Sequence, residues 1–464
     1  MCIEVKMFPQ YMHLTSDGKH IVVFDVETSS LVELDMSSAA IVEEALIHGG
    51  FDETTYEAAR KLLHLRGVTD SEFIQAKQVV EELLEKGLFA QRDHAMIDSE
   101  DILIPHSAIT LNVSQKCQLN CTYCFAAGGS YGGSSLISNM SSEIGRKAID
   151  LISKIVFDKA PRFTISYFGG EPLLNWELIE ELTLYAEQKA REIGKKVGFS
   201  ITTNAIAIDE MKAKFLADHQ FGVIVSLDGN EELHNRLRPH KDERVNSYAE
   251  TIKGIELLRR HCSIGCRATV TSSFANAGDL DSYLREAGAT VAYLAPVSSD
   301  SCDSLILDGI SLRTYVASLS ESFFSEDHDR LMPIRRIKKQ IEDGYKSPWG
   351  CGFAYNTLTV DVTGSIYACH RMTSNELFCV GSVYEGLLHD KVLELRKAAN
   401  STQKLGCRSC WLRYLCASEC VVENYNVTGS MSVPNSYSCY RTTRLYEAAI
   451  ESYLVSIQRA TSSS

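Results

Sequence analysis

The 464-residue sequence has no apolar run near the about 20 residues that a membrane span requires. Its first residues, MCIEVKMFPQYMHL, lack the apolar segment of a signal peptide. It has no excess of basic residues, since 60 Asp and Glu outnumber 46 Lys and Arg and the net charge is −14. A nucleic-acid surface typically needs a basic stripe. These absences argue against membrane insertion and nucleic-acid binding, and they predict a cytoplasmic protein.

Cysteine, in contrast, is abundant, with 15 residues. Disulfides are disfavoured in the reducing cytosol, so clustered cysteines there more often bind metal or take part in chemistry. Three cysteines lie within residues 117–124, and seven are spread over 351–439. The cysteines outside these two sets are Cys2, Cys262, Cys266, Cys302 and Cys379. No Cys–His pairing stands out, which disfavours catalysis by a cysteine nucleophile.

The pattern of apolar residues divides the chain into parts. Residues 1–95 show short strands followed by helices that open with an Asp at the N-cap, which predicts a compact, winged-helix-like α+β domain. A polar linker at 91–105 follows. Residues 104–330 alternate strand and helix six times, which predicts a parallel sheet with right-handed crossovers. Six units are too few for a closed eight-fold barrel, so we expect an α/β fold of the partial (β/α)6 TIM-barrel type.

In such a barrel the functional residues gather at the carboxyl ends of the strands. Distinctive residues follow the predicted strands at those ends, namely Cys117–Cys124, Gly169–Glu171, Thr202–Asn204 and Ser226–Gly229. Beyond the barrel we expect a cysteine-rich domain at 345–442 and a C-terminal helix and tail at 443–464.

Cys117, Cys121 and Cys124 form a C-x3-C-x2-C motif directly after a predicted strand. Three thiolates on one tight loop suit a [4Fe–4S] cluster whose fourth iron stays open. A structural zinc site usually has four protein ligands, and no fourth ligand is apparent nearby. The alternative interpretation is a set of buried structural cysteines.

With Tyr123 in the aromatic position before its last cysteine, this motif resembles the signature of the radical S-adenosylmethionine (radical SAM) superfamily. The resemblance covers about residues 104–300. It implies that the open iron chelates the amino and carboxylate groups of SAM, which one electron cleaves to methionine and a 5′-deoxyadenosyl radical. That radical abstracts hydrogen from an unactivated C–H bond. The cofactor supplies the chemistry, and the protein supplies position and exclusion of water.

Further motifs follow in the order of the family. FGGEP lies where the family contacts the SAM amino group, and SLDG with HNRLR resembles a segment whose serine and arginine contact SAM. Glycines allow close approach of the backbone to a ligand, and a carboxylate complements an ammonium group. Taken alone, GGE is a weak motif, an arginine is more often a surface charge, and Asn204 is equally a turn residue. The cofactor-binding residues that the resemblance implies are Tyr123 near the adenine, Gly169, Gly170, Glu171, Ser226 and Arg238.

The C-terminal cysteines include a G-x4-C run that ends at Cys369 and a C-x2-C-x5-C-x3-C run. They resemble the SPASM domain, an iron–sulfur domain with two auxiliary [4Fe–4S] clusters, over about residues 348–440. By family correspondence the distal cluster is held by Cys407, Cys410, Cys416 and Cys439. The proximal cluster is held by Cys351, Cys369 and Cys420.

The proximal set is one ligand short. Sulfatase-maturing members of the family have a further cysteine between the equivalents of Cys351 and Cys369, and this interval has none. The proximal cluster therefore has either an open iron, able to bind a substrate thiolate, or another ligand such as Cys379. Those members also have an aspartate base directly after the G-x4-C run, where this chain has His370, which counts against sulfatase maturation. His370 is either a catalytic general base near neutral pH or a structural histidine.

Residues 1–95 resemble the PqqD-like recognition element of enzymes that modify ribosomally made peptides (RiPPs). The resemblance rests on the order of elements and not on a sharp motif. It implies binding of the leader of a precursor peptide, added as a strand at a sheet edge. A dimerisation or structural domain is the alternative.

The three-part order also resembles maturases that form thioether bridges: the sactipeptide, ranthipeptide, six-cysteine-peptide and quinohemoprotein amine dehydrogenase maturases. The resemblance implies an oxidoreductase that removes hydrogen from a peptide residue, joins a peptide cysteine to that carbon, and passes the leftover electron to the auxiliary clusters. It implies SAM, three [4Fe–4S] clusters and a reductant such as flavodoxin or ferredoxin. The same core also suits C–C cross-linking, epimerisation or decarboxylation. A zinc-ribbon-like peptide adaptor without catalysis is the rival interpretation, since C-x2-C fits zinc.

Overall fold

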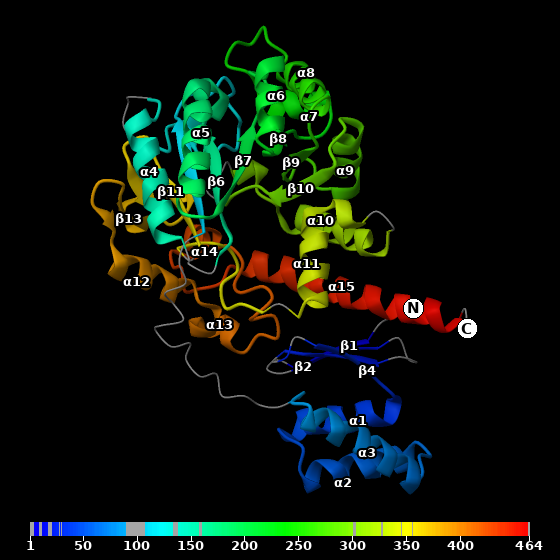
Figure 1. The fold of residues 1–464 in the computed structure, drawn as a ribbon. Helices are drawn as coiled ribbons and strands as arrows, with labels where there is room; N and C mark the ends of the chain where they lie inside the picture. Colours follow the sequence, from blue (N-terminus) through cyan, green and yellow to red (C-terminus); the bar gives the residue numbers. More distant parts are fainter. Residues whose placement is uncertain are drawn as a thin grey trace.

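The computed structural model describes residues 4–8, 12–16, 21–26, 28, 30–89, 107–132, 138–156, 160–299, 303–325, 328–344, 346–354 and 356–462. The predicted linker at 91–105, together with Cys2 and Cys302, lies outside these residues. Figure 1 shows an N-terminal unit below a larger lobe that contains the barrel and the C-terminal region. None of the described helices is long and apolar enough to cross a lipid bilayer.

The N-terminal unit consists of an antiparallel sheet followed by three helices. Its strands pair in chain order: β1 (Glu4–Phe8), β2 (Met12–Ser16), β3 (Ile21–Asp25) and β4 (Ser30–Leu34). The helices are α1 (Met36–His48), α2 (Glu53–Leu65) and α3 (Asp70–Glu85). Strand β1 was not predicted. Helix α3 is capped by Thr69 and not by Asp70, because Thr69 and Glu72 form a capping box.

Strand β3 is buried on both faces and joins the N-terminal unit to the rest of the molecule. Successive side chains of a strand point to opposite faces. Ile21 and Val23 pack in the core formed with α1–α3, whereas Val22 and Phe24 pack in the core of the main lobe. The rings of Phe24 and Trp411 meet edge to face with centroids 5.9 Å apart. The unit is therefore attached to the C-terminal, cysteine-rich region.

Six parallel strands in chain order form the barrel sheet, which confirms the predicted α/β fold. They are β5 (Ala108–Ser114), β6 (Arg162–Gly169), β7 (Lys196–Thr203), β8 (Gly222–Ser226), β9 (Ile264–Val270) and β10 (Val291–Pro296). The helices beside them are α4 (Ser142–Ile155), α5 (Trp176–Glu192), α6 (Glu210–Asp218), α7 (Glu231–Leu237), α8 (Ser247–Arg259), α9 (Ala277–Glu286), α10 (Gly309–Glu321) and α11 (Met332–Glu342). Helix α4 buries Ile144, Ala148 and Ile152, a spacing that gives one apolar face toward the sheet.

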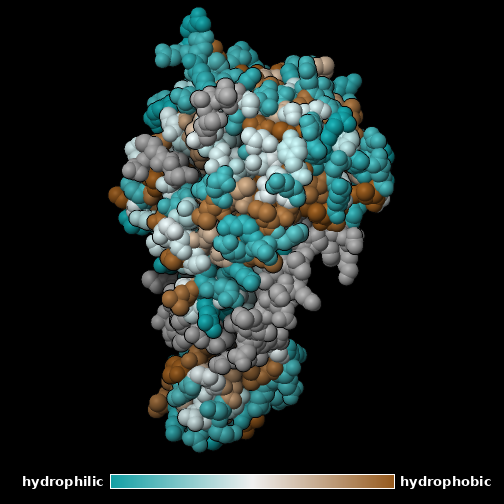
Figure 2. All heavy atoms as spheres, turned by 90° about the vertical axis from the view of Figure 1, so that its left-hand side faces the viewer, coloured by the Kyte–Doolittle hydropathy of each residue, from teal (hydrophilic) through white to brown (hydrophobic). Residues whose placement is uncertain are grey.

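The C-terminal region extends the same sheet. Strand β11 (Thr357–Val360) pairs in parallel with β5, and β12 (Ser365–Tyr367), β13 (Cys379–Ser382) and β14 (Gly386–Leu387) continue it in antiparallel fashion. Helices α12 (His389–Ala399), α13 (Leu405–Arg408), α14 (Val421–Thr428) and α15 (Ser436–Ser462) complete the chain. Figure 2 shows a mixed hydrophilic and hydrophobic surface on the visible face of the main lobe and hydrophobic patches on the N-terminal unit.

Candidate functional site

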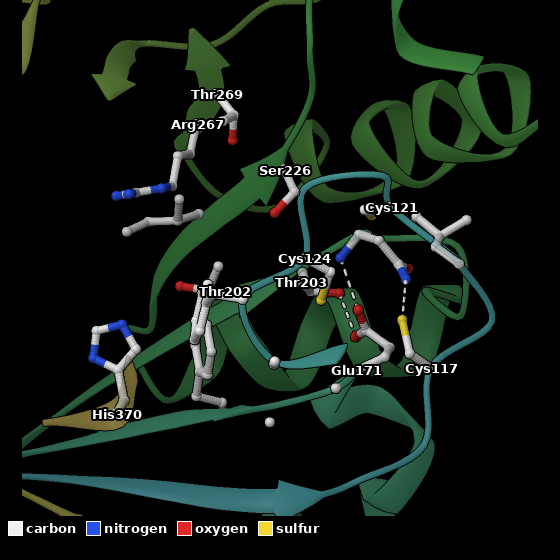
Figure 3. A pocket seen from close by; sticks show the side chains of 18 of the residues that line it. Cys117, Cys121, Cys124, Glu171, Thr202, Thr203, Ser226, Arg267, Thr269 and His370 are labelled. Carbon is white, nitrogen blue, oxygen red and sulfur yellow. Dashed lines mark hydrogen bonds between the residues drawn. The ribbon is translucent and has the colours of Figure 1, made fainter. Parts of the chain in front are cut away.

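A cavity of about 420 Å³ lies at the carboxyl ends of the parallel strands, a volume within the range of small-molecule sites. Alternate residues of each strand project into the barrel, because strand side chains alternate between faces. The strand residues that line the cavity are rich in hydroxyl groups, and they include Thr110, Ser166, Ser200, Thr202, Ser226, Arg267 and Thr269 (Figure 3). Ser226, predicted as a SAM contact, thus faces this cavity.

Cys117, Cys121 and Cys124 lie in the loop after β5 and line one side of the cavity (Figure 3). The amide of Thr122 donates to the Leu237 carbonyl at 2.9 Å, which fastens the loop to the end of α7. Burial raises the pKa of the Cys117 thiol to about 11 and that of Cys121 to about 12. Both are therefore thiols at neutral pH, and metal binding must release their protons.

Gly169 and Gly170 join the end of β6 to the start of this cysteine loop. The amide of Gly170 donates to the Ser114 carbonyl and that of Glu171 donates to the Lys116 carbonyl, both at 2.7 Å. A Cβ on Gly169, whose φ is +141°, would lie 2.2 Å from the Ser114 oxygen, and one on Gly170 would lie 2.5 Å from the Lys116 oxygen. The glycines thus permit close contact of two backbone segments, whereas the sequence analysis explained them by close approach of a ligand.

Glu171 is a buried carboxylate that connects the ends of β6 and β7. Its Oε1 accepts from the Thr203 hydroxyl at 2.6 Å, and its Oε2 accepts from the Asn204 amide at 2.8 Å. The Asn204 side chain in turn donates to Gln118 at 3.2 Å and lies 4.0 Å from the Cys117 sulfur. Burial raises the pKa of Glu171 to about 7, and these hydrogen bonds oppose that rise.

Asp228 is completely buried and holds Tyr123 and Arg238 together. Arg238 donates from Nε to Oδ2 at 2.9 Å and from Nη2 to Oδ1 at 3.2 Å, while the Tyr123 hydroxyl donates to Oδ2. The backbone amide of Thr269 also donates to Asp228 Oδ1, at 2.9 Å. Arg238 and Tyr123, which the resemblance implied as SAM contacts, both line the cavity, and two nitrogen atoms of the Arg238 guanidinium bind Asp228 inside the protein.

His370 lies across the cavity from the cysteine loop (Figure 3). Its ring packs against Phe168 and Phe125, with centroids 5.1 Å and 5.7 Å away. Burial, followed by the charges of Arg371 and Arg267, lowers the pKa of His370 to about 3. The imidazole is therefore neutral near pH 7 and too weakly basic for efficient general-base catalysis there, which disfavours the predicted general-base role.

Arg371 connects the cavity to the C-terminal cysteine region. Its Nη2 donates to Glu423 at 2.5 Å and to the Ser298 hydroxyl, and its Nη1 donates to the Cys420 sulfur at 3.5 Å. Glu423 also accepts from the Ser299 hydroxyl at 2.6 Å. Because both serines follow β10, this network fixes the end of the barrel against the segments that carry Cys420 and Arg371.

The seven cysteines of the C-terminal set lie in two groups. Burial raises the pKa values of Cys351, Cys369, Cys407, Cys416 and Cys439, and neighbouring thiols of the same group add to that rise. The first group contains Cys351, Cys369 and Cys420, and the second contains Cys407, Cys410, Cys416 and Cys439. These are the groupings that the SPASM resemblance implied. Cys379, the possible extra ligand, lies on β13 with its sulfur 3.7 Å from the Gly381 carbonyl, and it is not among the groups that shift Cys351 or Cys369.

Lys404 lies between the two groups and is 1% exposed. Its ammonium donates to the Ser418 hydroxyl at 2.7 Å. Burial lowers the pKa of Lys404, and thiols of both groups, Cys407 and Cys416 first, oppose this shift. A buried cation is thus placed where negative charge would develop on deprotonation of either group.

The Radical SAM superfamily model matches residues 111–273, from β5 to just past β9. This segment contains the cysteine loop, Glu171 and Arg238. The chain is a radical SAM enzyme. The radical SAM cyclopropyl synthase TigE of Paramaledivibacter caminithermalis is 29% identical over 251 residues, which are 46% of this chain and 50% of TigE. The match therefore spans half the length of that relative.

Two solved structures share the fold of this radical SAM enzyme. The structure of native anSMEcpe with bound AdoMet is 20% identical, covers 77% of this chain and all of that chain, and has a TM-score of 0.65. Streptococcus suis SuiB bound to precursor peptide SuiA is 15% identical, covers 94% of this chain and all of that chain, and has a TM-score of 0.52. At these identities the likeness establishes the fold alone.

The sequence analysis of this radical SAM enzyme missed three residues around the cavity. Asp228 has a signal in the SLDG segment, where only the serine received a role. Arg267 has a signal as a charged residue within the apolar strand GCRATV. Arg371 has none, since its partners Ser298 and Glu423 come from distant parts of the chain.

Proposed function

We propose that this radical SAM enzyme modifies a ribosomally made precursor peptide by joining a cysteine sulfur of the peptide to a carbon atom, which forms a thioether. The observation that carries the proposal is the shared cavity. The cysteine loop after β5 forms one side of it, and the segment directly after Cys369 forms another. A substrate here lies between two separate cysteine groups. Thioether formation needs a C–H bond broken beside a held sulfur, and this arrangement suits both requirements.

The cysteine loop is the proposed site of the SAM-cleaving [4Fe–4S] cluster. The donor set fits, because three thiols line one wall of the cavity and a buried carboxylate stands beside them. SAM and this cluster, when bound, supply a carbon radical that abstracts hydrogen. Ionised Glu171 accepts a hydrogen bond from the SAM amino group. The remaining cofactor contacts in the proposal are Tyr123, Gly169, Gly170, Ser226 and Arg238.

The two C-terminal groups are the proposed sites of auxiliary [4Fe–4S] clusters. Among the described residues, the group of Cys351, Cys369 and Cys420 has no fourth cysteine, which leaves a position for a peptide thiolate. These clusters, when bound, supply an acceptor for the electron left after the C–S bond forms. Lys404 offsets the negative charge of the thiolates, and Arg371 donates to one of them.

The N-terminal unit is the proposed binding site of the leader. Strands β1 and β4 are the edges of its described sheet, and an extended peptide adds to such an edge through main-chain hydrogen bonds. SuiB, which shares the fold over 94% of this chain, is described with its precursor peptide. Because β3 packs against Trp411, a leader bound here is attached to the cysteine-rich region. A reductant such as flavodoxin or ferredoxin supplies the electrons.

Anaerobic reconstitution followed by iron, sulfide and zinc analysis is the first test. Three clusters give about 12 irons per chain with matching sulfide. When the enzyme is incubated with SAM, a reductant and a cysteine-bearing precursor peptide, each thioether makes the peptide lighter by two hydrogen atoms. About 4 irons per chain would keep the SAM site and contradict the auxiliary clusters. Zinc with little iron would contradict the enzyme.

Carbon–carbon bond formation is the second candidate, and the name of TigE, a cyclopropyl synthase, favours it. The two chemistries differ in what happens to sulfur. A thioether consumes one peptide thiol per link, so alkylation of the product labels fewer cysteines. A carbon–carbon link gives the same loss of mass and leaves every thiol free to react. Epimerisation changes no mass, and decarboxylation removes carbon dioxide.

A further inference from the structure

The cavity is basic although the chain is acidic. The net charge of the chain is −14, yet the charged side chains among the described lining residues are Arg238, Arg267, Arg371 and Glu171. The lining therefore has three cationic side chains and one carboxylate.

Arg267 lacks the carboxylate partner that the other two arginines have. Arg238 pairs with Asp228 at 2.9 Å, and Arg371 pairs with Glu423 at 2.5 Å. No described acceptor forms a hydrogen bond or ion pair with Arg267. Arg267 is exposed to the open cavity, so its guanidinium is accessible to a ligand. A planar guanidinium that no described carboxylate binds favours an anionic ligand with paired oxygen acceptors.

The position of Arg267 indicates which molecule brings the anion. Its side chain extends from β9 away from Cys117, Cys121 and Cys124, toward the side of the cavity where His370 lies (Figure 3). SAM belongs at the cysteine loop, where its amino and carboxylate groups would chelate the open iron. Its single carboxylate would be used there, so an anion at Arg267 belongs to a second molecule. That molecule is the substrate.

We propose that Arg267 binds a carboxylate of the peptide substrate, so that the modified segment carries an acidic side chain or the C-terminal carboxylate. This assignment rests on the proposed function, because it takes the cavity as the place where the peptide reacts. The planar guanidinium binds a carboxylate through paired hydrogen bonds, which also orient it. Arg267 is then a specificity-determining residue that fixes which peptide carbon faces the cysteine loop.

The test uses the reconstituted full-length enzyme with SAM under anaerobic conditions. NMR titration measures the dissociation constants of the blocked peptide Ala-Ala-Asp-Ala-Ala, its Asn counterpart, and pentaalanine with a free C-terminal carboxylate. Wild-type enzyme is expected to bind an Asp or free-carboxylate peptide about tenfold more tightly than the Asn peptide, as a charge-assisted pair provides. The two carboxylate peptides distinguish a side-chain source from a terminal one.

Three variants give the control series. Arg267→Gln is expected to remove the preference for the carboxylate, and Arg267→Lys to keep part of it, since lysine retains the charge without the planar fork. Arg260→Gln, at the exposed end of α8, is expected to keep all of it. Equal affinity of the wild type for carboxylate and amide peptides would overturn the assignment, and so would a preference that survives Arg267→Gln.

SAM also carries a carboxylate that Arg267 could bind. Equilibrium dialysis with labelled SAM tests this alternative to a peptide carboxylate. A loss of SAM affinity of about tenfold in Arg267→Gln, with no peptide preference in the wild type, would assign the arginine to SAM and overturn the proposal. Failure of the proposed function gives a different result, namely missing iron or missing SAM cleavage in the wild-type enzyme. The carboxylate preference is a binding measurement and needs neither result.

Discussion

The two cysteine-bearing regions of this enzyme are held in place by different kinds of structure. The loop with Cys117–Cys124 follows a regular strand, and backbone hydrogen bonds from Gly170 and Glu171 fasten its start. The C-terminal cysteines lie in turns, in the short helix α13 and at the start of the long helix α15. Between Cys416 and Cys420, three consecutive non-glycine residues have φ of 48°, 62° and 53°. Each such residue costs on the order of 1–3 kcal/mol.

Side chains from distant segments hold this left-handed turn. Lys404 donates to Ser418, while Arg441 and Thr442 of α15 both donate to Glu419, Thr442 at 2.5 Å. The first region is therefore positioned by the backbone of a parallel sheet, and the second by buried polar side chains. This difference predicts that mutations act on the two regions separately, and in different ways.

The largest contrast is expected from removing cysteines region by region. Alanine at Cys117, Cys121 and Cys124 should reduce SAM cleavage to background and remove about 4 irons per chain. Alanine at Cys407 and Cys410 should also remove about 4 irons but leave SAM cleavage measurable, because the β5 loop does not depend on that group. Iron analysis and quantification of 5′-deoxyadenosine check both. Complete loss of cleavage in the second variant would contradict independent regions.

Two buried ion pairs give the next contrast. Asp228→Asn leaves the buried Arg238 unpaired and should lower the free energy of unfolding by about 3–5 kcal/mol. Glu423→Gln leaves Arg371, whose side chain is 16% exposed and partly solvated, and should cost about 1 kcal/mol. Denaturant midpoints of the two variants measure the difference. Equal losses of unfolding free energy in the two variants would mean that the contact between the barrel and the C-terminal region is as tightly packed as the barrel itself.

Alanine at one glycine in each region is a finer comparison. A Cβ on Gly170 would lie 2.5 Å from the Lys116 carbonyl, and one on Gly350 would lie 3.0 Å from those of Cys416 and Glu419. Gly170→Ala should cost about 1–3 kcal/mol and weaken SAM binding, while Gly350→Ala should cost less and lower only auxiliary iron. Thermal unfolding and iron analysis test this, and a larger effect of Gly350→Ala would reverse the expected order.

The smallest expected effect is a pH dependence confined to the first region. Burial raises the pKa of Glu171 to about 7, and its ionised form accepts hydrogen bonds from the SAM amino group. SAM affinity should therefore be full above pH 7 and fall below it by up to about tenfold per pH unit, as proton linkage requires. Glu171→Gln should weaken binding and flatten the profile in equilibrium dialysis. An unchanged profile in that variant would assign the dependence to another group.

Local signals in the sequence predicted much of the barrel. Apolar periodicity marked the six strands, and the cysteine loop, Glu171 and Ser226 follow the strands they were expected to follow. Non-local contacts were missed. The pairing of β11 with β5 joins strands separated by the whole barrel, and no periodicity encodes it. The reason for Gly169 was missed as well, because the atoms that a Cβ would meet belong to Ser114 on another strand.

By itself, the sequence determined which strands form the barrel, and it identified the radical SAM signature that supplies the cysteines for the first group. Local pattern fixes both, since apolar periodicity marks each strand and Cys117, Cys121 and Cys124 lie within eight residues of the chain. Only the tertiary structure decided that Arg371 reaches the cavity and that Arg267 lacks a partner. Burial and charge pairing depend on which distant segments meet, and that is settled by packing.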